Sequence, residues 1–390
     1  MPRSSRLVFL TAALAFAGSL TVPVSTAADT RDAESVPTEA VASSLSPEEL
    51  EDLDTYAQLN GRELADVVEQ FSGVSDFIRM VGEAQEQLPD NFVYAEWGHG
   101  SGFLAVRPDG YETARELAVQ SGADSEVLKS DAPAESVQQQ LVNAVAQSLE
   151  ESSADTFKVS YDYEANRIVA SAESGFSAKR LAIPEQLIDQ ASKSGTRIEV
   201  VSGDSEISQA AARGGMVYSG CTGGFIGKPS SGSTYRGIIT AKHCATRPSS
   251  YDGATTIASG SNEILGKDLR FTRFSAGTWN NTFRYDTGAF RSVTAQINPV
   301  VGAVACKYGK VTGRFCTTIA KNGVTVTGAG SDMSETAAGS VQPGDSGGPW
   351  YYGSSAMGIT YGYRHPANQP TNPTADLFTR LGSDYYALTS

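Results

Sequence analysis

The heptapeptide Pro343-Gly344-Asp345-Ser346-Gly347-Gly348-Pro349 lies late in a chain of 390 residues. Its serine is flanked by small residues where the backbone has to turn sharply, and glycines allow another chain to approach the main chain closely. Such a serine is either an incidental member of a glycine-rich β-turn or an exposed nucleophile. The second interpretation requires a base elsewhere in the chain and an acid that orients the base.

The sequence offers three histidines as the base, His99, His243 and His365. His243 follows the apolar run Gly237-Ile238-Ile239, in the segment Thr240-Ala241-Lys242-His243-Cys244-Ala245. A histidine beside a cysteine can also bind zinc, but the chain has no second cysteine–histidine pair at the required spacing. His99, within a Gly-His-Gly turn, and His365 are expected to be loop residues. His243 is therefore the candidate base.

These two segments together resemble the motifs of chymotrypsin-fold serine peptidases, in particular the bacterial alpha-lytic protease and streptogrisin type. The resemblance implies that Ser346 is the nucleophile and that His243 is the general base. It also implies that the backbone amides of Gly344 and Ser346 form the oxyanion hole. The expected reaction is hydrolysis of peptide bonds through an acyl-enzyme.

In this family the acid lies between the histidine and the serine in the sequence. Asp286, in Tyr285-Asp286-Thr287-Gly288-Ala289-Phe290, is the best candidate because it precedes an apolar, strand-like stretch. The segment is one residue longer before its alanine than the Asp-x-Ala motif of the family. Asp252 and Asp268 are the competitors, and their polar, turn-like surroundings favour solvated side chains. The predicted triad is therefore His243, Asp286 and Ser346.

Residues 1–27 have the pattern of a secretory signal peptide. A basic start precedes a largely apolar run from Leu7 to Val22, and small residues follow at a cleavage position. The apolar run is too short and too soon interrupted to favour a membrane span. We therefore expect an exported, extracellular protein that does not associate with the membrane. Residues 28–45 are polar and are expected to be disordered.

Charge divides the rest of the chain into an acidic and a basic half. Residues 29–206 hold 35 acidic and 12 basic side chains, a net charge of −23, whereas residues 207–390 hold 9 acidic and 16 basic ones, a net charge of +7. This contrast predicts electrostatic docking between the halves, the alternative being a merely acidic, soluble upstream domain. The basic residues are scattered without a basic run or helix, which disfavours a nucleic-acid partner.

Residues 46–202 are predicted to form an α+β domain. Ser46-Pro47-Glu48-Glu49 has the pattern of a helix start with a capping box. Alternation from Phe157 to Ala172 predicts a β-hairpin, and a helix around 184–191 and a strand over 197–201 complete a strand-strand-helix-strand unit. By its position this domain resembles the pro region of alpha-lytic protease and its relatives. Those pro regions assist folding and then occupy the active site until they are cleaved away.

Residues 203–213 are small and polar, and we expect them to be an exposed, cleavable junction before a mature domain over 214–390. That domain has short apolar runs separated by Gly, Ser, Thr and Asn turns, a pattern typical of an all-β fold. Helical periodicity returns only from Ala375 to Leu388. The resemblance implies two six-stranded antiparallel β-barrels with the triad between them, and a short C-terminal helix.

Four cysteines in an exported chain, Cys221, Cys244, Cys306 and Cys316, imply two disulfides with three possible pairings. The family resemblance implies the pairs Cys221–Cys244 and Cys306–Cys316. A third disulfide that is common in the family is missing, because Ser340 stands at its first position. A looser wall of the substrate pocket is therefore expected.

Asp345, directly before the candidate nucleophile, needs a counter-charge. In bacterial members of the family, the counter-charge comes from a basic residue that directly follows the cysteine at the Cys306 position. Here that residue is Lys307. The resemblance thus predicts a Lys307–Asp345 ion pair that holds the oxyanion loop, the alternative being a solvated surface lysine.

The substrate pocket is expected between Ser340-Val341-Gln342 and Thr360-Tyr361-Gly362-Tyr363. The family usually has Thr-Ser-Gly-Gly in the second segment, and the two tyrosines predict a pocket that is narrowed toward small side chains. A preference for acidic side chains, through Arg364 and His365, is the alternative. No acid stands at the position of the pocket base, which disfavours a preference for Lys or Arg.

The sequence as a whole predicts a secreted serine endopeptidase, made as a self-processing precursor and monomeric when mature. Its partners would be protein or peptide substrates and its own pro region, and it would need neither a metal nor an organic cofactor. One alternative is a catalytically silent extracellular binding module on the same fold. Another is a serine esterase of the α/β-hydrolase fold, since Gly344-Asp345-Ser346-Gly347-Gly348 fits Gly-x-Ser-x-Gly with His365 downstream.

Overall fold

The computed structural model describes residues 45–389 with several gaps. The gaps are at residues 99, 152–156, 164, 173–184, 194, 203–204, 210–216, 219, 231–234, 245–249, 252–253, 265, 277–278, 328–329, 367–372 and 388. The predicted signal peptide, the predicted disordered segment up to residue 44, His99 and part of the predicted junction therefore lie outside the described residues.

Three helices open the described chain, and the first begins at the predicted capping box. The backbone amide of Ser46 donates to Glu49 Oε2 at 2.8 Å, and the amide of Glu49 donates to Ser46 Oγ at 3.2 Å. These two bonds satisfy amides that the first helical turn leaves without partners. The helices are α2 (Pro47–Leu59), α3 (Leu64–Gln70) and α4 (Val74–Gln87).

A small sheet in the order β1-β2-β3 follows, and α4 and α5 pack against it. Phe77 of α4 lies against Trp97 of β1, with ring centroids 5.5 Å apart. Gly102 of β2 is pressed against the same phenylalanine ring, so that no larger residue fits there. The elements are β1 (Phe92–Gly98), β2 (Ser101–Val106), the 3₁₀ helix η1 (Pro108–Gly110), α5 (Tyr111–Ser121) and β3 (Ser125–Lys129).

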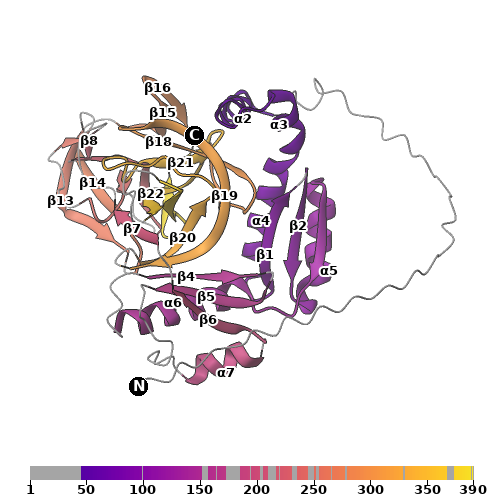
Figure 1. Ribbon diagram of the computed structural model, residues 1–390. Helices are drawn as coiled ribbons and strands as arrows, with labels where there is room; N and C mark the ends of the chain where they lie inside the picture. The colour runs from indigo at the N-terminus through magenta and orange to yellow at the C-terminus, as the bar shows by residue number, and fades with distance from the viewer. Residues whose placement is uncertain are drawn as a thin grey trace, which may run out of the picture. The chain divides into compact units, whose positions relative to one another are not determined.

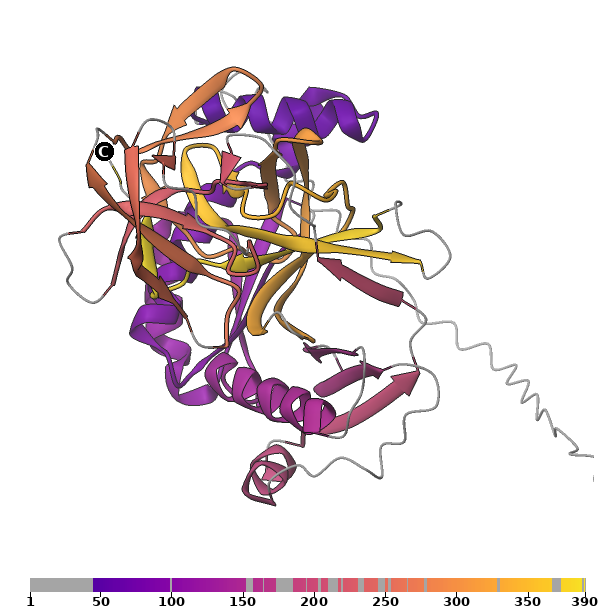
Figure 2. The same ribbon diagram turned by 90° about the vertical axis from the view of Figure 1, so that its left-hand side faces the viewer.

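The predicted strand-strand-helix-strand unit is confirmed. It consists of β4 (Phe157–Asp162), β5 (Arg167–Ala172), α7 (Glu185–Lys193) and β6 (Arg197–Ser202), and α6 (Glu135–Glu151) precedes it. Apolar residues of α6, including Leu141 and Leu149, pack on Val159 and Ile168 of the sheet. Val159 is also paired with Thr325 of β19, so this sheet continues into the C-terminal half of the chain (Figures 1 and 2).

From residue 217 onward the described chain is built from strands. One sheet has six strands in the order β12-β13-β14-β11-β10-β24. In the other sheet, β18-β21-β22-β23-β20-β19 form a closed ring, because β19 also pairs with β18. This agrees with the predicted all-β class, while the complete two-barrel arrangement stays a prediction.

The bounds of these strands fix the positions used below. They are β8 (Val217–Tyr218), β9 (Cys221–Thr222), β10 (Ile226–Pro229), β11 (Gly237–Thr240), β12 (Ser250–Tyr251), β13 (Ala254–Glu263), β14 (Arg270–Ala276), β15 (Thr282–Asp286), β16 (Ala289–Ser292), β17 (Ala295–Gln296), β18 (Val304–Gly309), β19 (Gly313–Val326), β20 (Gly330–Thr336), β21 (Pro349–Tyr352), β22 (Ser355–Pro366), β23 (Ala375–Arg380) and β24 (Tyr385–Ala387).

The predicted helix from Ala375 to Leu388 is wrong. This stretch forms β23 and β24, and all six residues of β23 are buried. Strands β20 and β22 pair with β23 on its two sides. Hydrogen bonding along both edges and full burial outweigh the weak helical spacing that the sequence shows.

The predicted junction is a paired strand over part of its length. Strand β7 (Ser205–Gln209) runs antiparallel to β22, with Gln209 opposite Gly362 and Ser205 opposite Pro366. These five residues are therefore paired to a sheet, and their exposure stays a prediction. The rest of the junction, residues 203–204 and 210–213, lies outside the described residues.

Both predicted disulfides, Cys221–Cys244 and Cys306–Cys316, are present. One apolar cluster contains Phe71 and Trp97 of the acidic half together with Phe225 and Trp350 of the basic half. The two halves therefore share a core, and the described residues belong to one compact unit. None of the helices in the described part of the chain has the length and apolarity that crossing a bilayer requires.

Candidate active site

His243 lies between the candidate nucleophile and an aspartate. Its Nε2 is 2.8 Å from Ser346 Oγ, and its Nδ1 is 2.7 Å from Asp268 Oδ2. The backbone amide of His243 also donates to Asp268 Oδ1 at 2.9 Å. Asp268 thus fixes both the main chain and the ring of the histidine. The three side chains form one continuous chain of hydrogen bonds.

Asp268 is the aspartate that contacts His243, so the prediction that Asp286 occupies this position is wrong. Asp286 lies at the end of β15 and accepts a hydrogen bond from the amide of Thr287 at 2.6 Å. Asp268 was expected to be solvated, but its side chain is only 5% exposed. Because β14 pairs with β11, the start of β14 lies beside the end of β11, where the His243 segment begins. This pairing brings Asp268 to the histidine.

The aspartate determines which histidine nitrogen carries the proton. A buried carboxylate accepts a hydrogen bond, so Nδ1 is the protonated nitrogen, and Nε2 is left with a lone pair toward the Ser346 hydroxyl. The His243 side chain is 14% exposed, which keeps bulk water from competing for these bonds. The arrangement can withdraw a proton from the serine and return it.

Two contacts hold the serine loop against the histidine loop. The amide of Thr222, at the end of β9, donates to the carbonyl oxygen of Ser346 at 2.8 Å. The preceding residue, Cys221, is joined by a disulfide to Cys244, the neighbour of His243. The disulfide therefore connects the segment that holds Ser346 to the segment that carries His243.

The backbone around Ser346 has the sharp turn that the glycines predicted. Gly344 has φ 107° and Gly347 has φ 83°, conformations that residues with a side chain rarely adopt. A Cβ atom on Gly347 would lie 2.1 Å from Thr240 Oγ1, so that position has no room for one. The amide of Gly347 donates to the carbonyl of Thr360 at 2.9 Å, which anchors the turn to β22.

The predicted Lys307–Asp345 contact is present in the structure. Lys307 Nζ lies 3.4 Å from Asp345 Oδ2, and both side chains are fully buried. Asp345 also accepts hydrogen bonds from the Thr312 hydroxyl at 2.5 Å and from the amides of Val311 and Gln342 at 2.8 and 3.0 Å. The alternative of a solvated surface lysine is therefore wrong.

Two tyrosines of the predicted substrate pocket, Tyr361 and Tyr363, are buried. Tyr363 is buried and packs on Val341 of the opposite wall. Tyr361 is also buried, and its ring meets the His243 ring edge to face, with centroids 5.4 Å apart. The carbonyl oxygen of Tyr361 is 3.4 Å from Ser346 Oγ. The segment 360–363 therefore lies beside Ser346, and its Tyr363 contacts Val341 of the segment 340–342.

Arg364 and His365, the two residues that could favour acidic substrate side chains, contact other residues of the protein. The guanidinium group of Arg364 forms an ion pair with Glu335 at 2.6 Å. His365 was expected to be a loop residue, but it lies in β22, is 1% exposed and packs near the Tyr363 ring. Because His243 is the histidine on Ser346 and the serine loop joins strands of an antiparallel sheet, the α/β-hydrolase alternative is wrong.

Asp376 is a residue that the sequence analysis missed. Its carboxylate is fully buried and accepts hydrogen bonds from the amides of Ser340, at 2.9 and 3.0 Å, and Val341, at 2.9 Å. Burial raises the pKa of Asp376 to about 6. Asp376 also ties down the wall that the missing disulfide was expected to leave loose.

In the part of the chain that the structure describes, one group of side chains has the spacing of metal ligands. It consists of Asp52, Cys306 and Cys316. The two cysteines are joined in a disulfide and offer no thiolate to a metal. This group therefore cannot act as a metal site while the disulfide is intact.

Comparisons with known proteins found serine proteases. No family model matches the chain. Serine protease 2 of Streptomyces fradiae is 31% identical over 154 residues, which cover 36% of this chain and 86% of that protein. Streptogrisin-C of Streptomyces griseus is 32% identical over 140 residues, covering 33% of this chain and 30% of that protein. Among solved structures, Thermobifida fusca protease A is 26% identical, with 44% of this chain and 92% of that one covered and a TM-score of 0.37.

Proposed function

This chain belongs to the chymotrypsin-fold serine proteases of bacteria and is a serine endopeptidase, and we propose that it is made as a secreted precursor that cleaves itself. The observation that carries the proposed mechanism is the chain of hydrogen bonds from Asp268 through His243 to Ser346. The acidic half is the proposed intramolecular partner of the protease, and the mature protease is proposed to act as a monomer.

In the proposed mechanism Ser346 Oγ attacks the carbonyl carbon of the substrate peptide bond, and His243 Nε2 takes the hydroxyl proton. His243 then gives that proton to the leaving amine, and an acyl-enzyme remains. Asp268, and not Asp286, keeps the imidazole in the required tautomer and stabilises its cationic form. A water molecule activated by His243 completes the hydrolysis.

The negative charge that develops on the substrate oxygen needs donors. We assign this role to the backbone amides of Gly344 and Ser346, because the turn of positive φ at Gly344 presents the main chain at the nucleophile. One such donor contributes about 3–4 kcal/mol to transition-state stabilisation. The buried Lys307–Asp345 contact supports this assignment, since it fixes the side chain between the two donors.

The specificity that we propose is for small side chains at the residue before the cleaved bond. The packing of Tyr363 on Val341 supports this choice, because it leaves little room between the walls. The engagement of Arg364 with Glu335 argues against the acidic preference, since the guanidinium charge already has a partner.

The pairing of β7 with β22 supports self-cleavage. Peptides commonly bind to proteins by adding a strand to a sheet edge, and β7 does this on the strand that carries Tyr361, whose carbonyl lies beside the nucleophile. Gln209, the last residue of β7, lies opposite Gly362, which directly follows Tyr361 in β22. We therefore propose that the precursor is cut just beyond Gln209, within residues 210–213.

Export is proposed from the pattern of residues 1–27 and from the two disulfides. Disulfides persist in oxidising surroundings, such as the outside of a bacterial cell. The silent binding module is kept as the second candidate, although a binding module has no need of a hydrogen-bonded triad.

The test is to secrete the wild-type protein and Ser346→Ala from the same host, and to compare them by intact mass and N-terminal sequencing. We expect the wild type to start within 210–213 and Ser346→Ala to keep the acidic half. If both proteins keep the acidic half, and neither digests denatured protein, the silent binding module replaces this proposal. If both are cut alike, another protease processes the chain, and self-cleavage is wrong.

A further inference from the structure

Two neighbouring acids of helix α2 meet two arginines of the basic half. Glu51 is 2.8 Å from Arg291 Nη2 and 2.8 Å from Arg314 Nη1 through its two carboxylate oxygens. Asp52 Oδ1 is 2.9 Å from Arg291 Nη1 and also contacts Arg314 Nη2. Each acid therefore contacts both arginines, and each arginine contacts both acids.

The contact is closed to solvent on the side of Asp52. Asp52 is fully buried, and the side chains of Arg291 and Arg314 are 4% and 7% exposed. The second carboxylate oxygen of Asp52 accepts the backbone amide of Gly353 at 2.6 Å. Charges held out of water in this way require partners of opposite sign in good geometry, because the cost of an unpaired buried charge is several kcal/mol.

Groups of the basic half also contact the guanidinium groups of Arg291 and Arg314. The guanidinium carbon of Arg291 lies 4.0 Å from the centroid of the Tyr285 ring, and that of Arg314 lies 5.2 Å from the same centroid. Arg291 Nη1 also donates to the carbonyl of Gly353 at 3.0 Å. The Tyr285 ring thus contacts both guanidinium groups, and the Gly353 carbonyl binds that of Arg291, so groups of the basic half contribute to their orientation.

We propose that Arg291, Arg314 and the amide of Gly353 form a receptor for paired carboxylates, and that this receptor anchors helix α2 after the chain has been cut. The proposal rests on the proposed cleavage within 210–213. Once that bond is cut, the acidic half is held by non-covalent contacts alone. Its occupant is α2, an acidic helix with adjacent Glu and Asp side chains.

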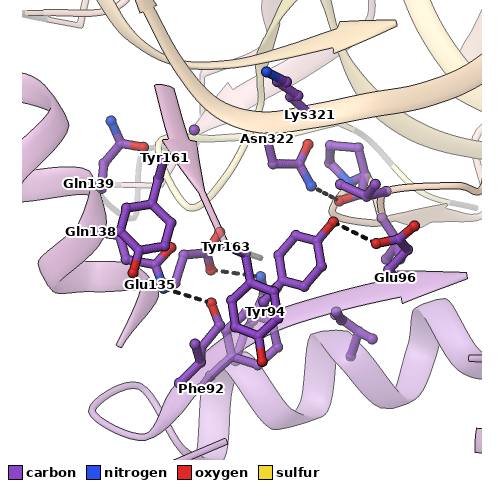
Figure 3. Close-up of a pocket in the computed structure, with 18 of the residues that line it drawn as sticks. Phe92, Tyr94, Glu96, Glu135, Gln138, Gln139, Tyr161, Tyr163, Lys321 and Asn322 are labelled. Carbon is purple, nitrogen blue, oxygen red and sulfur yellow. Dashed lines mark hydrogen bonds between the residues drawn. The ribbon is translucent and has the colours of Figure 1, made fainter. Parts of the chain in front are cut away.

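Another contact between the halves is less well packed. A cavity of about 350 Å³ lies between β1 and α6 on one side and β19 on the other. Figure 3 shows Tyr94 and Tyr163 of the acidic half facing this space, with Lys321 and Asn322 of β19 across it. The two tyrosine rings stack on one another, with centroids 4.6 Å apart. The α2 contact, in contrast, pairs two acids with two buried arginines, which makes it the stronger candidate for an anchor.

The test uses the full chain carrying Ser346→Ala and a recognition site for a sequence-specific protease placed within 210–213. The folded chain is cut by that added protease, and the dissociation constant of the two fragments is measured by analytical ultracentrifugation. Because the cut does not depend on Ser346, the test stands even if self-cleavage fails. Asp52→Lys is compared with Asp54→Lys, which makes the same charge change on the same helix at a residue bonded to Gln58.

We expect Asp52→Lys to raise the dissociation constant at least about 100-fold, because it places a third cation against two buried guanidinium groups. Asp54→Lys is expected to stay within about threefold of the parent, as an exposed charge contributes little. Should Asp52→Lys prevent folding, Glu51→Lys at a side chain that is 43% exposed gives the same comparison. A foldable Asp52→Lys or Glu51→Lys protein that dissociates no more readily than Asp54→Lys overturns the proposal.

Discussion

The assignment of Asp268 as the acid predicts that Asp268→Asn is severely impaired and that Asp286→Asn is not. An asparagine at 268 can present its amide group to His243 Nδ1, which favours the imidazole tautomer with the proton on Nε2. That nitrogen would then face the Ser346 hydroxyl, 2.8 Å away, without a lone pair to accept its proton. The carbonyl oxygen of the asparagine can still accept the backbone amide of His243, so the loop should keep its place.

The size of the loss follows from the tautomer. In serine protease triads the wrong tautomer lowers kcat about 10⁴-fold, which corresponds to roughly 5.5 kcal/mol in the activation free energy. Asp286 is bonded to its neighbour Thr287 and not to His243, so Asp286→Asn is expected to change kcat less than about twofold.

The assay is the hydrolysis of a chromogenic peptide by each variant, after an added protease has cut the chain at an inserted site and the acidic half has been removed. Circular dichroism spectra that match the wild type would exclude unfolding. A loss below about tenfold for Asp268→Asn, or an equal loss for Asp286→Asn, would refute the assignment.

Three further predictions concern the serine loop and its supports. Lys307→Met leaves Asp345 buried without its cation, and should lower both the free energy of unfolding, by about 3–5 kcal/mol, and kcat. Urea unfolding in the Ser346→Ala protein measures the first effect, and peptide hydrolysis measures the second. An unchanged kcat would remove the ion pair from the mechanism. Gly347→Ala places a methyl group 2.1 Å from Thr240 Oγ1 at φ 83°, and should cost at least about 1–3 kcal/mol of stability in the same unfolding assay, whereas a change near zero would contradict the tight turn. Because burial raises the pKa of Asp376 to about 6, its protonation stabilises the fold at low pH, and this contribution is lost as pH rises through about 6. From about pH 7.5 down to pH 5, the free energy of unfolding of the Ser346→Ala parent should therefore rise by about 1.4 kcal/mol relative to that of the same protein with Asp376→Asn. Equal pH dependences of the two proteins would disprove this prediction.

The sequence alone was sufficient to predict those parts of the site whose residues stand in recognisable local motifs. Ser346 and His243 stand in motifs of several residues, and both meet in the structure. The disulfides and the Lys307–Asp345 contact also follow from positions within such motifs. In each of these cases the identifying residues are neighbours in the chain.

The misassigned residues are those whose position depends on pairing between strands that are distant in the sequence. Asp268 stands in a polar stretch, and only the pairing of β14 with β11 carries it to His243. The alternation that begins with Leu269 and Phe271, directly after Asp268, was the available signal of a strand there. Asp376 likewise reaches the pocket wall because β23 pairs with β22, in a stretch that its spacing suggested to be a helix. Local patterns cannot report which strand lies beside which.

The most direct test of the proposed mechanism is labelling with a fluorophosphonate, a reagent that reacts with activated serine hydroxyls. The wild-type protease, freed from its acidic half, is treated with the reagent, digested and examined by mass spectrometry beside His243→Ala. We predict one adduct, on Ser346 in the wild type, and at least a thousandfold slower labelling of His243→Ala. An unlabelled Ser346, or labelling that does not depend on His243, would contradict the account.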